Sequence, residues 1–147
     1  VVGKKKIMDL PDVGNMSSTN SANPIACSAG LAVIEEIQKK KLTLKSKRLG
    51  VLLHKGLNNI KKKFPNLFDV YGKGLIASMV FDKRVPNINY KLKLIVEDAM
   101  KNGLLLCYTG RESIKIGPPL TITREALKEG LKIIEESVEK IFKNEQN

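Results

Sequence analysis

The chain has 147 residues, of which 42% are hydrophobic and 28% are charged, so it can bury a core and is not disordered as a whole. Its net charge of +11 raises nucleic-acid binding as a function, but aromatic residues make up only 5% and only four of the 26 basic residues are arginine. Because nucleic-acid sites favour arginine and stacking aromatics, the composition instead favours lysine-rich, solvated helix faces.

The first predicted helix begins at Asn23-Pro24 and runs to about residue 41. An asparagine side chain can cap free backbone N–H groups, and proline at the first helical position loses no hydrogen bond. Its first turns hold small side chains, from Ala26 to Gly30, which predict close packing against a neighbour.

A second helix is predicted over residues 45–63, after a break near residues 42–44, because leucine and isoleucine recur there at helical spacing. The only histidine, His54, adjoins this apolar stripe. No Cys, Asp or Glu is placed to complete a metal set with it, so we interpret His54 as a helix-flank residue and expect no metal site.

Two short β-rich runs, residues 67–71 and 75–81, flank Gly72-Lys73-Gly74 and predict a hairpin. This GKG sequence is too short for a Walker loop and joins two strands, so it predicts a turn. The remaining predicted elements are a helix over 90–102 stopped by Gly103, strands at 104–107 and 114–116, and a last helix capped by Thr123.

This order predicts a two-layer α+β unit from residue 67 onward, with helices on one face of a small, mainly antiparallel sheet. The first 65 residues close no core of their own. Cys27 and Cys107 form no CxxC pair, and no apolar run reaches the ~18 residues of a spanning helix. With no signal peptide visible, we expect a soluble, cytoplasmic protein without a membrane partner.

Three consecutive hydroxyl residues, Ser17, Ser18 and Thr19, precede the first helix. They form either a solvated loop or a phosphate cradle. Hydroxyls donate to phosphate oxygens, and the positive end of the following helix favours an anion. Ser/Thr/Asn-rich segments before helices are nevertheless most often ordinary loops, so the residues alone leave both interpretations open.

Four segments in order resemble the C-terminal part of the class III aminotransferases, which use pyridoxal phosphate and include 4-aminobutyrate and acetylornithine aminotransferases. The segments are VVGKKKIMD, SSTNSANPIACSAGLAVIE, GKGLIASMVF and IKIGPPLTIT. The resemblance implies an α/β fold class, as the C-terminal part of a fold-type I pyridoxal-phosphate transferase. Residues 1–65 would then hold the end of the large cofactor-binding domain plus linking helices, and residues 66–147 the small α+β domain.

The same resemblance implies roles for four residues. Thr19 would bind the phosphate of pyridoxal phosphate, with Ser18 as an adjacent contact, and in this family that threonine serves the opposite subunit of a homodimer. Lys115 stands where several members place an arginine that binds the substrate carboxylate, and Arg111 in the preceding turn is a possible substitute. Lysine offers a point charge in place of a bidentate fork. Asn20 departs from the His, Tyr or Phe of many relatives.

The resemblance also implies that the catalytic residues lie outside this chain. The family's Schiff-base lysine lies upstream of the segment that corresponds to VVGKKKIMD, and none of Lys4, Lys5 or Lys6 matches it. We therefore expect an inactive fragment of an active enzyme. The implied reaction is ping-pong transfer of an amino group from an ω-amino acid, such as 4-aminobutyrate, or an ornithine-like donor to a 2-oxo acid. Alternatives are a racemase or decarboxylase of the same fold, or a basic nucleic-acid-binding module supported only by the charge.

Overall fold

The structure of the chain is a computed structural model that describes residues 3–12, 14–15, 18–20 and 22–143. The chain divides into two compact units, residues 1–40 and 41–147. The first unit contains α1 (Lys5–Met8) and α2 (Pro24–Lys39). The second contains α3 (Leu42–Lys63), α4 (Ile88–Lys101), α5 (Arg124–Lys143), β1 (Phe68–Lys73), β2 (Ile76–Phe81), β3 (Cys107–Tyr108) and β4 (Ser113–Ile116).

Helix α2 begins where the sequence predicts. The Asn23 side chain accepts a hydrogen bond from the Ile25 N–H at 2.9 Å, and Pro24 occupies the first helical position. No residue of α2 is buried, and a methyl group added to Gly30 would meet no other part of the chain within 4 Å. The described residues therefore do not supply the neighbour that the small side chains of this helix predict.

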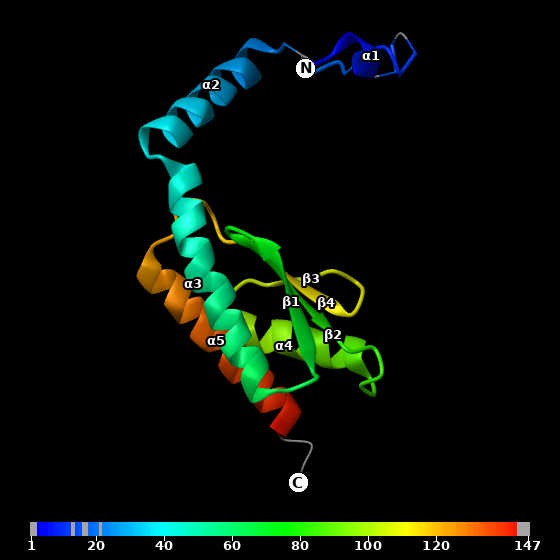
Figure 1. Ribbon diagram of the computed structural model, residues 1–147, viewed down its shortest axis with the longest axis vertical. Helices are drawn as coiled ribbons and strands as arrows, with labels where there is room; N and C mark the ends of the chain where they lie inside the picture. The colour runs from blue at the N-terminus through cyan, green and yellow to red at the C-terminus, as the bar shows by residue number, and fades with distance from the viewer. Residues whose placement is uncertain (1–2, 13, 16–17, 21, 144–147) are drawn as a thin grey trace. The chain divides into compact units, whose positions relative to one another are not determined.

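The second unit is the predicted two-layer α+β fold (Figure 1). Its four strands form an antiparallel sheet in the order β1-β2-β4-β3. Burial alternates along β2, where Ala77, Met79 and Phe81 are buried while Ile76 and Val80 are exposed. The buried face of the sheet packs against α3, α4 and α5, and the other face is open.

The core of the second unit lies between this sheet and the three helices. Every helix and strand of the second unit except β3 contributes buried residues to this core. They are Leu53, Leu57, Ile60, Phe68, Leu75, Ala77, Met79, Phe81, Ile88, Leu92, Ile95, Ile114, Ile116, Leu127, Ile134 and Val138. The Phe81 ring lies 5.1 Å from that of Phe68 and 6.4 Å from that of Phe142, centroid to centroid. Aromatic contacts therefore join β1 and β2 to α5.

Helix α3 starts earlier than predicted. It begins at Leu42 instead of residue 45. The interruption between α2 and α3 lies one residue earlier, at Lys41, whose backbone has a φ of 48°. The Leu42 side chain is only 4% exposed. Burial of this leucine compensates for a first turn that carries no side-chain cap, so packing overrides the local signal.

The sheet also differs from the prediction in its details. Strand β1 extends to Lys73, so the hairpin turn lies at residues 74–75. Strand β3 begins only at Cys107, because Leu104 and Leu106 pack against the core without pairing in the sheet. Helix α3 packs on the sheet and lies in the same compact unit, residues 41–147.

Candidate functional site

The hydroxyl loop consists of Ser18 and Thr19, which precede α2 and are both exposed. The Ser18 hydroxyl oxygen accepts a hydrogen bond from the Asn20 N–H at 3.3 Å, which leaves the Ser18 O–H free to donate. The Thr19 hydroxyl forms no hydrogen bond with any described residue. Ser17 and Met16 lie outside the described residues. Two hydroxyl donors are thus available in this loop.

The start of α2 favours a negatively charged ligand. The helix has 16 residues, and its first turn contains no acidic side chain. Asn23 caps one N–H, while the remaining free N–H groups and the positive end of the helix dipole lie at the end of α2 that the hydroxyl loop precedes in the chain. Hydroxyl donors beside an uncompensated helix N-terminus fit a phosphate group, which is the group that the resemblance assigns to this loop.

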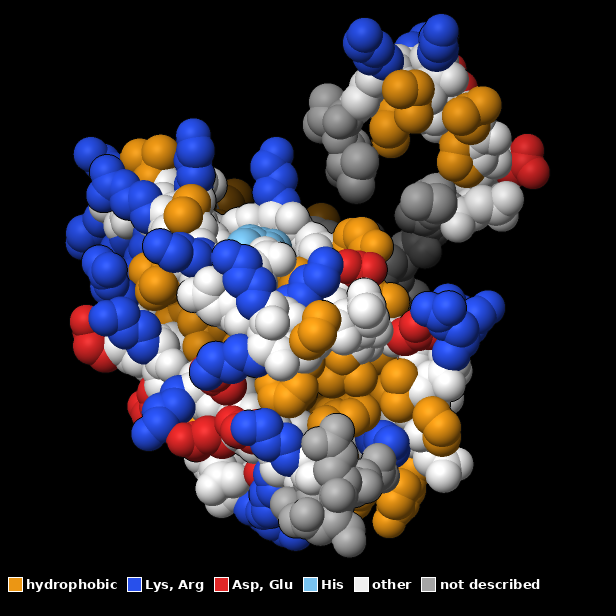
Figure 2. Space-filling view, turned by 60° about the horizontal axis from the view of Figure 1, so that its bottom comes forward, with side chains coloured by type: hydrophobic (Ala, Val, Ile, Leu, Met, Phe, Trp, Pro, Cys, Tyr) orange, Lys and Arg blue, Asp and Glu red, His pale blue; other side chains and the backbone are white. Residues whose placement is uncertain are grey.

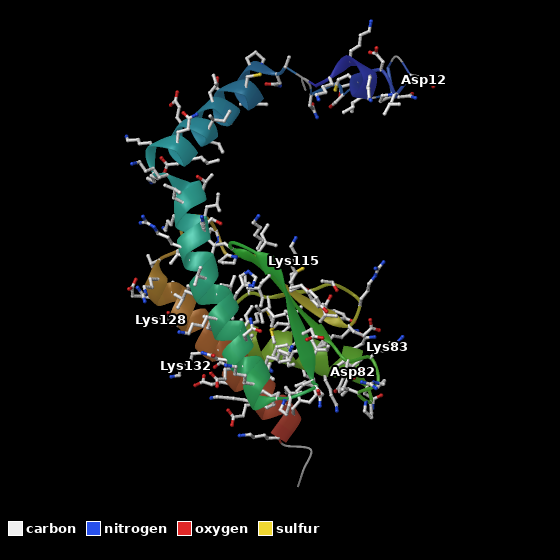
Figure 3. The ribbon with its side chains drawn as sticks, in the orientation of Figure 1. Asp12, Asp82, Lys83, Lys115, Lys128 and Lys132 are labelled. Atoms are coloured by element: carbon white, nitrogen blue, oxygen red, sulfur yellow. The ribbon has the colours of Figure 1, made fainter. Side chains whose placement is uncertain are left out.

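Lys115 lies on β4, on the open face of the sheet (Figure 3). The register pairs it with Ser78 on β2 and with Cys107 on β3, and Ser78 in turn pairs with Tyr71 on β1. Side chains directly opposite each other in an antiparallel pair lie about 4.5–5.5 Å apart at Cβ. Tyr71, Ser78, Lys115 and Cys107 therefore form one polar row across the open face.

Lys115 is available for an anionic ligand, because its amino group forms no ion pair with any described residue. Arg111 is also exposed and precedes β4 in a turn closed by a hydrogen bond from the Thr109 N–H to the Ser113 carbonyl at 3.2 Å. Its guanidinium likewise has no acidic partner in the described part of the chain. Both cations belong to the second unit, whereas Ser18 and Thr19 belong to the first.

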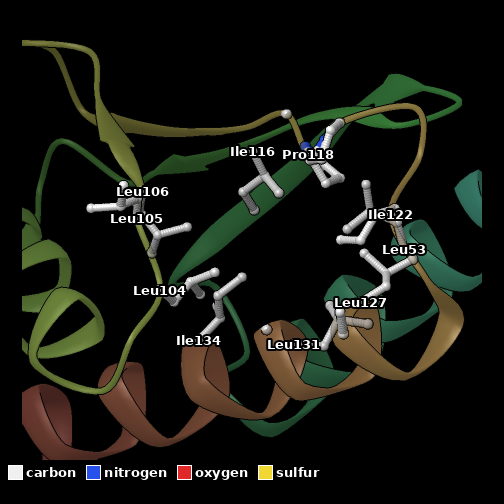
Figure 4. Close-up of a pocket in the computed structure, with 14 residues that line it drawn as sticks. Leu53, Leu104, Leu105, Leu106, Ile116, Pro118, Ile122, Leu127, Leu131 and Ile134 are labelled. Carbon is white, nitrogen blue, oxygen red and sulfur yellow. The ribbon is translucent and has the colours of Figure 1, made fainter.

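Behind Lys115, the neighbouring Ile116 faces the helices and lines an aliphatic cavity of about 220 Å³ (Figure 4). Every residue that lines this cavity is leucine, isoleucine, alanine, proline or glycine. A charged substrate would lose its hydration there without gaining a partner. The cavity is therefore unsuited to a charged ligand.

The histidine, the cysteines and the lysines of α1 give less support to a binding or catalytic role. His54 is half-buried on α3, and the described residues contain no cluster of three or more His, Cys, Asp or Glu that could hold a metal ion. Both cysteines are free and exposed. Lys5 and Lys6 lie in the exposed α1. None of the helices in the described part of the chain combines the length and hydrophobicity needed to cross a bilayer.

Comparison with known proteins decides the family. The family model described as aminotransferase class-III matches residues 1–138. The chain belongs to this family. The resemblance seen in the sequence is thereby confirmed, and class III aminotransferases of this kind depend on pyridoxal phosphate.

Individual relatives support the same assignment. The chain is 41% identical over 140 residues to 5-aminovalerate aminotransferase of Pseudomonas putida, covering 92% of this chain and 33% of that protein. It is 38% identical over 142 residues to leucine/methionine racemase of Thermococcus litoralis, covering 94% and 32%. The crystal structure of acetylornithine aminotransferase from Elizabethkingia anophelis matches with a TM-score of 0.76 and 31% identity, covering 91% and 33%. The chain therefore spans about a third of the length of these relatives.

The sequence did not predict the neighbours of Lys115. Ser78 and Cys107 are brought beside it by pairing of β4 with β2 and β3, which are separated from each other in the chain by α4. The period-2 pattern shows that these residues face the open side, but not which strands are adjacent. Only the register of the sheet identifies them as potential contacts of a ligand held by Lys115.

Proposed function

We propose that the whole protein to which these 147 residues belong is a pyridoxal-phosphate-dependent aminotransferase of the cytoplasm. The observation that carries the proposal is the match of residues 1–138 to the class III family, together with an exposed hydroxyl loop ahead of an uncompensated helix N-terminus. The free state of Cys27 and Cys107 agrees with a reducing compartment.

In this proposal Thr19 and Ser18 donate hydrogen bonds to the phosphate of the cofactor. The free hydroxyl of Thr19 and the donor capacity left to Ser18 support these roles. When bound, pyridoxal phosphate supplies the electron sink that makes a proton on the amine-bearing carbon removable. We propose that the lysine that would carry the cofactor lies outside these 147 residues; the family resemblance supports this, because none of Lys4, Lys5 or Lys6 matches its position.

We propose further that the hydroxyl loop serves the cofactor of a second subunit, in a homodimer with shared sites. Helix α2 supports this arrangement because several of its apolar side chains are more than half exposed, among them Ile25, Leu31 and Val33. Apolar side chains exposed along one helix are typical of a surface that packs against another polypeptide. The small residues from Ala26 to Gly30 would permit that partner a close approach.

Lys115 is proposed to bind the carboxylate of the substrates, with Arg111 as a second cation. The proposed donor is an ω-amino acid, such as 4-aminobutyrate, or an ornithine-like diamine, and the proposed acceptor is a 2-oxo acid. Relatives named for 5-aminovalerate and acetylornithine support this substrate class. Their names describe amines at the far end of a carboxylate-bearing chain, and a cation on the open sheet face would hold that carboxylate.

A racemase is the second candidate, because leucine/methionine racemase is 38% identical over most of this chain. The two activities are separated by supplying the whole protein, loaded with pyridoxal phosphate, with each of three donors and 2-oxoglutarate. The aminotransferase proposal predicts glutamate formation from 4-aminobutyrate, 5-aminovalerate or an ornithine derivative. Inversion of L-leucine or L-methionine without any glutamate formation would replace it with the racemase.

A further inference from the structure

A second hollow lies between the first half of α3 and the hairpin turn that joins β1 to β2. We call it the hairpin hollow; it has a volume of about 680 Å³ and is lined by Thr43, Ser46, Lys47, Gly50, Val51, His54, Gly72, Lys73 and Gly74. It brings together two features that the sequence indicates separately, the GKG sequence at the end of β1 and the only histidine. Both walls belong to the second unit, so the hollow is formed within one compact body.

The floor of the hairpin hollow is a close backbone contact. A methyl group added to Gly50 would lie 2.5 Å from the Gly74 Cα, so α3 and the turn approach as closely as glycine allows. The Ser46 hydroxyl oxygen accepts a hydrogen bond from the Leu75 N–H at 3.3 Å. These contacts fix the turn against the helix, so both walls of the hollow belong to one packed structure.

The charge of the hairpin hollow is positive. Lys47 comes from α3 and Lys73 from the end of β1, and neither forms an ion pair with a described residue. None of the nine lining residues is acidic. Helix α3 has no side-chain cap and no acidic residue in its first turn, so its positive dipole end adds to the two lysines at the Thr43 side. The site favours an anion.

Two hydroxyl donors and an apolar surface indicate which class of anion the hairpin hollow would bind. The Thr43 hydroxyl lines the hollow, and the Ser46 hydroxyl keeps its proton free to donate. The His54 ring contributes to the wall, but its Nε2 is buried and offers the ligand no hydrogen bond. Figure 2 shows this histidine in pale blue near Lys and Arg side chains. Val51, which is 69% exposed, gives the rim an apolar surface.

We propose that the hairpin hollow binds the phosphate group of a small phosphate monoester, with the organic part of the ligand against Val51. Two unpaired cations on opposite walls match a dianion, and two hydroxyl donors serve its additional oxygens. The volume exceeds that of a phosphate alone, which leaves room for the organic part. This inference does not rest on the proposed aminotransferase activity.

The test titrates phenyl phosphate and inorganic phosphate by calorimetry into the whole protein, which is first loaded with pyridoxal phosphate and then dialysed to remove the excess cofactor, itself a phosphate monoester. The double variant Lys47→Gln/Lys73→Gln should weaken phenyl phosphate binding at least about tenfold, because it removes both charged donors. Lys128→Gln/Lys132→Gln on α5 removes the same charge from exposed lysines outside the hollow (Figure 3) and should change binding less than about twofold. Val51→Glu should abolish binding while leaving the urea midpoint unchanged.

Three results would overturn the proposal. Equal weakening by the two lysine pairs would show attraction to net charge only. Loss of binding in Thr19→Ala, with binding retained in Lys47→Gln/Lys73→Gln, would place the phosphate at the hydroxyl loop. Tighter binding of inorganic phosphate than of phenyl phosphate, or no binding of either, would exclude a site for phosphate monoesters.

Discussion

Asp98 on α4 offers a stability prediction whose size follows from the structure. Its carboxylate is almost buried and accepts hydrogen bonds from the Ser137 hydroxyl at 2.9 Å, the Lys140 amino group at 2.5 Å and the Asn102 side chain at 3.3 Å. Ser137 is fully buried on α5. This cluster is the polar connection between two helices whose other contacts are mainly apolar.

Replacing Asp98 with alanine removes the acceptor of all three bonds and leaves the Ser137 hydroxyl unsatisfied. A hydrogen bond to a charged group contributes about 1.5–3 kcal/mol, and an unsatisfied buried hydroxyl costs about 1–3 kcal/mol. The Lys140 side chain is 58% exposed, so solvent reduces its share. We therefore expect Asp98→Ala to lower the free energy of unfolding by about 2–4 kcal/mol.

Urea unfolding of the wild type and of the two alanine variants Asp98→Ala and Glu97→Ala measures this difference. Glu97 is the exposed acidic neighbour on the same helix, and its replacement should change stability by less than about 0.5 kcal/mol. Equal losses in the two variants would refute the reasoning, because burial and the hydrogen bonds would then contribute nothing.

The same carboxylate predicts a pH dependence. The hydrogen bond from Lys140 lowers the pKa of Asp98 below its ordinary value of 3.8, against the opposing effect of burial. A lowered pKa in the folded state stabilises the protein above the unfolded value, and this stabilisation is lost as pH falls through the folded pKa. The stability difference between wild type and Asp98→Asn should therefore shrink below about pH 4. A constant difference down to pH 2 would contradict the assignment.

Two further predictions concern the substrate site and two glycines. Lys115→Ala should raise the KM for a carboxylate-bearing donor about tenfold or more, and Lys115→Arg should restore the KM of the wild type. Lys132→Ala should leave KM unchanged, and an equal KM in all variants would remove Lys115 from the site. Gly130→Ala should raise the free energy of unfolding by about 1 kcal/mol, because alanine favours the helix more than glycine and its methyl group would contact Leu104 at 3.4 Å. Gly103→Ala should lower the free energy of unfolding, because Gly103 has a φ of +88°. Thermal unfolding measures both changes.

Local signals in the sequence predicted where α2 and α5 begin. Asn23 caps α2 through the Ile25 N–H, and Thr123 caps α5 through the Ala126 N–H at 3.1 Å. Each cap depends on residues within one turn of each other, so the sequence contains the whole interaction. The start of α3 at Leu42 depends instead on burial in a core built from distant segments, which no local pattern records.

The candidate site likewise combines residues that local sequence motifs indicate with residues that only the fold brings together. Ser18, Thr19 and Lys115 could be proposed as site residues because each lies in a motif that can be recognised without knowing the fold. Ser78 became a neighbour of Lys115 only through strand pairing, and the hairpin hollow depends on the contact of Gly50 with Gly74 across α3 and the turn. Such contacts join residues far apart in the chain, so spacing and composition do not predict them.

Cofactor retention in Thr19→Ala tests the central claim most directly. The loss of one hydrogen bond to a charged phosphate, about 1.5–3 kcal/mol, predicts a Kd for pyridoxal phosphate about 10- to 100-fold higher in this variant of the whole protein. Thr121→Ala, at an exposed loop threonine of the second unit, should bind the cofactor like the wild type. Equal cofactor absorbance after dialysis of the Thr19→Ala variant and the wild type would show that the hydroxyl loop does not hold the phosphate.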